Sequence, residues 1–132
     1  MEATSMGAAE SSNKVAIEGV ICSGIFSWRK EQGNKFLTQV TDSQSLQERL
    51  SYLVNINTPK HQANEQQVYI VLPGSIGSAL EFLLVWNVLE IEILANKKPS
   101  AQVILFKDPW EAYVQMNAKV LNFDLGKYNV DK

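Results

Sequence analysis

The chain is poor in cysteine and histidine and has no excess of positive charge. Cys22 is its one cysteine and His61 its one histidine. An intramolecular disulfide framework is therefore excluded, and there is no Cys/His cluster of the kind that holds structural zinc. The formal net charge of −2 gives no electrostatic reason to expect nucleic acid or an anionic membrane as a partner. Any phosphate binding must come from local backbone geometry.

Long hydrophobic runs and targeting signals are also missing. Residues 1–13 are rich in Ala, Ser and Glu and lack the basic and apolar regions of a secretory signal. The longest apolar stretch, 82–95, is too short to cross a bilayer and is interrupted by Asn87, Glu90 and Glu92. We therefore expect a cytoplasmic protein that has no membrane partner.

The composition is that of a globular protein. Hydrophobic residues make up 45% of the chain and charged residues 20%, and 132 residues suffice for one domain with its own core. We expect a single domain over 1–132, in which the polar stretch 57–67 is a loop insertion.

Periodicity and capping signals predict alternating helices and strands. Helix 46–56 has Ser43 or Ser45 as its candidate N-cap, and Asp108-Pro109 marks the start of the last helix. The predicted helices are 2–12, 46–56, 79–95 and the one that follows Asp108; the predicted strands are 14–21, 36–40, 67–72 and 102–106. This order predicts an α/β fold with a mostly parallel sheet.

Three segments are unusually apolar. Strands 67–72 and 102–106 lack polar alternation, which is typical of strands buried on both faces of a parallel sheet. Helix 79–95 is apolar almost all round, so we expect it to be buried on more than one side. A subunit interface, and hence a homodimer through helix 79–95, would explain that excess.

The turn after strand 67–72 carries the strongest chemical signal. Its sequence is Pro73-Gly74-Ser75-Ile76-Gly77-Ser78. A glycine-containing turn between a parallel strand and a helix presents free backbone N–H groups and the positive end of the helix dipole, which together favour a phosphate. The spacing matches neither the Walker A nor the dinucleotide pattern. A competing interpretation is a capping box, in which Ser78 caps the helix and Glu81 bonds back to it; both interpretations can hold together.

The segment from Leu72 to Glu81 resembles the P-G-G-x-G-T-x-x-E signature of the LONELY GUY proteins, also called lysine decarboxylase-like. Three other segments are similar to parts of that family: Leu46-Gln47-Glu48-Arg49 to the helix with its E-R pair, 35–40 to the segment before that helix, and 19–21 to its G-V-I strand end. Together the similarities cover about residues 1–118.

The resemblance implies a Rossmann-like three-layer fold and a nucleoside 5′-monophosphate phosphoribohydrolase, which cleaves the N-glycosidic bond to give free base and ribose 5-phosphate. It implies no cofactor and no metal. The catalytic residues it implies are Glu81, which stabilises the oxocarbenium-like transition state, and Arg49, which orients the substrate. The phosphate-binding residues it implies are Gly74, Ser75, Ile76, Gly77 and Ser78.

The sequence departs from the family in three places. Ser75 replaces a glycine and Ser78 a threonine, the loop 57–67 is longer, and the family's first strand and glycine-rich turn have no counterpart before Met1. The expected fold is therefore N-terminally truncated. Without the resemblance, the better interpretation of Arg49 is a solvated helix residue that pairs with Glu48 or Asp42. The alternative function is a non-catalytic nucleotide-binding or interaction fragment that dimerises with a full-length relative.

Overall fold

The computed structural model describes residues 2–26, 33–54, 67–122, 124 and 126. The chain divides into two compact units, Met1–Lys60 (unit 1) and His61–Lys132 (unit 2). Each unit pairs two short parallel strands, and helices alternate with these strands along the chain, so the described part of the protein is α/β. The single domain over 1–132 stays a prediction. The expected insertion 57–67 lies outside the described residues, except for Gln67.

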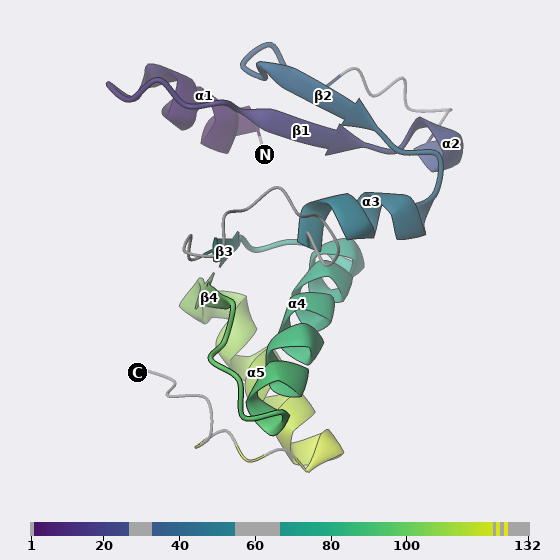
Figure 1. The fold of residues 1–132 in the computed structure, drawn as a ribbon, viewed down its shortest axis with the longest axis vertical. Helices are drawn as coiled ribbons and strands as arrows, with labels where there is room; N and C mark the ends of the chain where they lie inside the picture. Colours follow the sequence, from purple (N-terminus) through teal and green to yellow (C-terminus); the bar gives the residue numbers. More distant parts are fainter. Residues whose placement is uncertain (1, 27–32, 55–66, 123, 125, 127–132) are drawn as a thin grey trace. The chain divides into compact units, whose positions relative to one another are not determined.

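Unit 1 contains one parallel strand pair (Figure 1). Its elements are α1 (Glu2–Glu10), β1 (Glu18–Ile21), α2 (Ser23–Phe26), β2 (Gln39–Asp42) and α3 (Leu46–Val54). The register of β1 and β2 runs from Glu18 opposite Gln39 to Ile21 opposite Asp42. α3 contacts β1 within this unit.

Strand β2 lies later in the chain than the predicted strand 36–40. Asn34 holds the preceding residues in a turn: its side-chain Oδ1 accepts a hydrogen bond from the Phe36 amide at 3.0 Å, and its carbonyl accepts one from the Leu37 amide at 3.2 Å. Thr38 then bonds to Ile17, accepting from its amide at 2.8 Å through Oγ1. The strand can therefore begin only at Gln39, after this local side-chain chemistry ends.

The start of α3 confirms one of its two candidate caps. Ser45 Oγ accepts a hydrogen bond from the Glu48 amide at 3.1 Å, while Glu48 Oε2 accepts one from the Gln44 amide at 2.8 Å. The arrangement differs from a capping box in one respect, because Glu48 reaches the amide of Gln44 and not that of the N-cap residue Ser45. Ser43 does not cap the helix; it is buried and donates to the Ile21 carbonyl at 2.7 Å, which joins the ends of β1 and β2.

A carboxylate also joins the carboxyl ends of β1 and β2. Asp42 accepts hydrogen bonds from the Ser23 hydroxyl at 2.6 Å and the Ser23 amide at 3.0 Å. These two bonds, the hydroxyl first, hold the pKa of Asp42 below its ordinary value of 3.8, because they stabilise the ionised form. Next to them, Gly24 lies so close to the Gln44 carbonyl that a side chain at this position would collide with it.

Unit 2 contains a second parallel strand pair, with two long helices (Figure 1). Its elements are β3 (Gln67–Val71), α4 (Ile76–Leu94), β4 (Ala101–Leu105) and α5 (Lys107–Leu121). The register of β3 and β4 runs from Gln67 opposite Ala101 to Val71 opposite Leu105. Within α5, Asp108 has non-helical dihedral angles (φ −103°, ψ 123°). Regular helix therefore starts at Pro109, as the sequence predicts.

An aromatic cluster forms the core of unit 2. Phe82 of α4 lies between Trp86 and Trp110, with ring centroids 5.4 Å and 5.6 Å away. Tyr113 meets Trp110 edge-on at 5.5 Å. Such tilted and edge-to-face pairs are favoured by the ring quadrupoles. The partly buried residues around this cluster come from β3, β4, α4 and α5: Val71, Ala79, Leu83, Val103, Leu105, Tyr113 and Val114.

Unit 2 covers one face of its strands, so the expectation that both strands are buried on both faces is wrong here. Along β3, Tyr69 and Val71 are partly buried whereas Val68 and Ile70 are exposed. The pleat sends alternate side chains to opposite faces, and the core lies on one of them. α4 behaves in the same way. Its buried residues are Phe82, Val85 and Trp86, and its exposed apolar residues include Leu80, Ile91 and Leu94.

We expect Ser23→Ala to raise the pKa of Asp42 toward 3.8, because the Ser23 hydroxyl makes the largest contribution to its lowering. Because the pKa of Asp42 is lower in the folded state, its bonds to Ser23 stabilise the fold at pH values above the unfolded-state pKa. This stabilisation is lost as the pH falls through the folded-state pKa. An NMR pH titration of the Asp42 carboxyl carbon measures this. Thr41→Val is the control, because it removes another hydroxyl-to-carboxylate bond, that of Thr41 to Glu18. An unchanged Asp42 titration in Ser23→Ala would contradict the assignment.

Candidate functional site

The start of α4 differs from the capping-box interpretation of the sequence. Ser75 is the N-cap residue, with extended dihedral angles (φ −92°, ψ −167°), and α4 begins at Ile76. The Ser75 carbonyl accepts the first intrahelical bond, from the Ala79 amide at 3.2 Å. Ser78 is therefore the third helical residue, and Glu81 lies in the second turn. The expectation that Ser78 caps the helix and pairs with Glu81 in a capping box is wrong.

The first turn of α4 presents backbone donors. Ser75 makes no side-chain cap bond. The amides of Ile76, Gly77 and Ser78 belong to the first turn of a helix, where the N–H groups have no intrahelical acceptor. Ser75 and Ile76 are exposed, and the 19-residue helix directs the positive end of its dipole to this turn. The five residues expected to bind phosphate, from Gly74 to Ser78, therefore lie together.

The two glycines of the turn have different surroundings. A side chain at Gly74 would collide with Ser78, whose Cβ lies 2.8 Å from the position that a Cβ would take. Gly74 is therefore needed for the turn to pack against the first turn of α4. At Gly77, by contrast, a Cβ would meet no atom within 4 Å. The space beside Gly77 is open, so another molecule can approach the backbone there.

Glu81 lies on the same side of α4 as this open space. Residues three and four apart on a helix are neighbours, so Glu81 follows directly below Gly77 and Ser78. Its side chain is partly buried. A carboxylate-bearing residue and a set of amide donors thus follow one another on one helix.

Arg49, the other expected catalytic residue, lies in the middle of α3 in unit 1. Its amide donates to the Ser45 carbonyl at 3.0 Å, within the first turn of the helix. Its place on a helix after β2 agrees with the predicted helix 46–56. The structure brings together the residues expected in unit 2, from Gly74 to Glu81, and describes Arg49 within unit 1.

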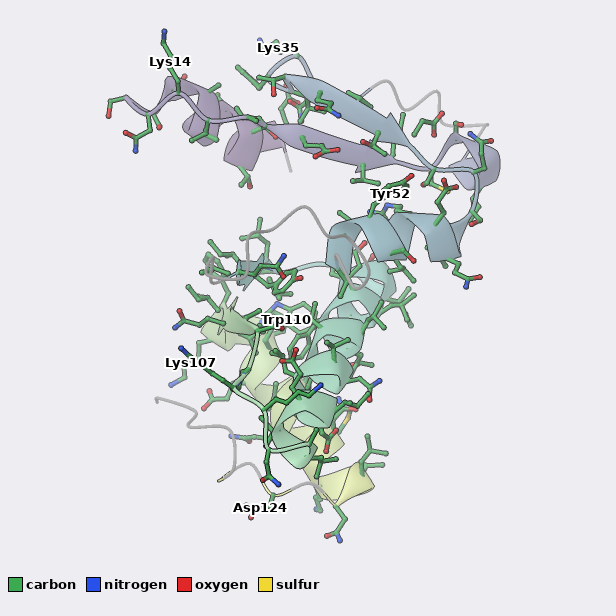
Figure 2. All side chains as sticks on the ribbon, in the orientation of Figure 1. Lys14, Lys35, Tyr52, Lys107, Trp110 and Asp124 are labelled. Carbon is green, nitrogen blue, oxygen red and sulfur yellow. The ribbon has the colours of Figure 1, made fainter. Side chains whose placement is uncertain are left out.

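Trp110 holds the candidate turn in place, which the sequence analysis did not anticipate. Its Nε1 donates a hydrogen bond to the Leu72 carbonyl at 3.2 Å, and the residue is 3% exposed. Because β3 and β4 are parallel, their carboxyl ends lie at one edge of the sheet, and this bond joins the residue after β3 to the first turn of α5. Figure 2 labels Trp110 in unit 2. The signal in the sequence that could have indicated this bond is a tryptophan directly after Asp108-Pro109, close to the carboxyl end of the strand that neighbours β3.

Lys107 brings positive charge to the same edge of the sheet. It is the first residue of α5, two positions after the end of β4, and Figure 2 labels it. Its Nζ lies 3.7 Å from Glu111 Oε2, and both side chains are largely exposed. An exposed pair of this kind contributes little to stability. Its ammonium group can therefore leave Glu111 for another anion at small cost.

Among the residues that the structure describes, no group of three or more His, Cys, Asp or Glu side chains is placed to hold a metal ion. In the same part of the chain, none of the helices is long and apolar enough to cross a membrane.

Comparison of the chain with protein-family models, with curated proteins and with solved structures finds no match.

We expect alanine substitutions at Gly74 and Gly77 to have different effects on the free energy of unfolding. We expect Gly74→Ala to lower the free energy of unfolding by about 1–3 kcal/mol, because the new Cβ overpacks against Ser78. Gly77→Ala meets open space and should leave stability unchanged or raise it by up to about 1 kcal/mol through helix propensity. Urea unfolding of both variants measures the difference. Equal effects of the two substitutions would contradict the described packing.

Trp110→Phe tests the bond that holds the turn. It keeps an aromatic ring in the core but loses the bond to the Leu72 carbonyl, so we expect a loss of about 1–2 kcal/mol in unfolding free energy. Hydrogen exchange of the Ala79 amide, which donates to the Ser75 carbonyl, should accelerate as well. Tyr113→Phe is the control, because it alters the same aromatic cluster without removing a ring. Exchange rates unchanged by Trp110→Phe would show that the bond does not position the turn.

Proposed function

We propose that the chain is a nucleoside 5′-monophosphate phosphoribohydrolase, possessing the activity that its resemblance to the LONELY GUY proteins implies. The observation that carries the proposal is the arrangement at the start of α4. Backbone donors, an open space beside Gly77 and the carboxylate of Glu81 lie on one helix, directly after a parallel strand. Open α/β sheets bind ligands at this place, outside the carboxyl ends of their strands.

The phosphate of the nucleotide would bind to the first turn of α4. The amides from Ile76 to Ser78 and the dipole of the helix supply the positive potential, so a basic surface is not needed. This agrees with the net charge of −2. The exposed Lys107 at the same sheet edge is an additional cation within unit 2.

Glu81 would act on the glycosidic bond. Hydrolysis breaks the bond between the ribose anomeric carbon and the base nitrogen; water supplies a hydroxyl to the carbon and a proton to the base. The transition state is oxocarbenium-like, so a carboxylate beside the anomeric carbon stabilises the developing positive charge and positions the attacking water. Arg49 is the proposed substrate-orienting residue, since its planar guanidinium can make two parallel hydrogen bonds.

The remaining parts of the proposal concern the fold, the partner and the location of the protein. β3, α4 and β4 form a parallel strand–helix–strand unit, the building block of doubly wound sheets, which supports a Rossmann-like three-layer fold. The proposed protein is cytoplasmic, needs no cofactor or metal, and forms a homodimer through helix 79–95. The exposed apolar residues of α4 support this last point.

The alternative is a nucleotide-binding fragment without turnover, which pairs with a full-length relative. Phosphate binding by the first turn of α4 uses backbone groups and does not depend on the carboxylate of Glu81. Binding and hydrolysis can therefore be separated by experiment.

The test is release of free base from AMP and from isopentenyladenosine monophosphate. We expect the wild-type chain to release base and Glu81→Gln to be at least about 100-fold slower, because the transition-state charge loses its counter-charge. Glu90→Gln is the matched control, since nine residues further along the helix it lies about 180° away from Glu81.

Calorimetry with the same nucleotides measures their affinity for the chain and so separates binding from hydrolysis. Binding without base release would select the non-catalytic alternative. Neither binding nor release would contradict the nucleotide site altogether, and equal rates for wild type and Glu81→Gln would contradict the role of the carboxylate.

A further inference from the structure

We draw no further inference here: the strongest candidate, the exposed apolar face of the β3–β4 strand pair that carries Val68, Ile70 and Ile104, supports no proposal because nothing in the structure shows what covers it.

Discussion

The hydrogen bond from Trp110 to the Leu72 carbonyl is the constraint on which the candidate site depends. The indole packs against Phe82 of α4 in the core, while its one donor reaches the backbone at the end of β3. A single buried side chain thus joins the helix that presents the donors to the strand that precedes it. The same loop also contacts the first turn of α4, through the Ser75 carbonyl and through the approach of Gly74 to Ser78.

The position of the first turn then decides what the site can do. Because Ser75 and not Ser78 ends the turn, the amides of Ile76, Gly77 and Ser78 all face the loop, and Glu81 lies one turn further along. A capping box would have used Glu81 to satisfy the helix itself. With α4 beginning at Ile76, Glu81 lies one turn after Gly77, where an added Cβ would meet no atom within 4 Å. The proposed binding of a phosphate and the proposed stabilisation of a cationic transition state both draw on this one helix.

The sequence predicts the order of helices and strands well, but it predicts poorly which of their faces are covered and which distant residues contact them. The start of α3 follows from a local signal, the Ser45 cap, and the apolar run after Gln67 predicts β3; the structure confirms the cap and the strand. The predicted start of α4 was wrong because Ser75 and Ser78 are both suitable N-cap residues. Only the backbone dihedral angles, which the sequence does not show, decide between them. An apolar run also does not show which of its faces is covered. The Trp110 bond escaped prediction because it joins residues 38 positions apart, through strand pairing that one sequence does not specify.

The central claim is that the first turn of α4 binds the phosphate of a nucleotide, and NMR titration tests it most directly. Amide shifts of the ¹⁵N-labelled full chain, followed while AMP is added, locate the bound phosphate residue by residue. The account predicts that the largest and saturable changes occur at Ser75, Ile76, Gly77 and Ser78, with adenosine producing much smaller changes there. Equal responses to AMP and adenosine at these amides, or AMP-induced changes confined to other parts of the chain, would contradict it.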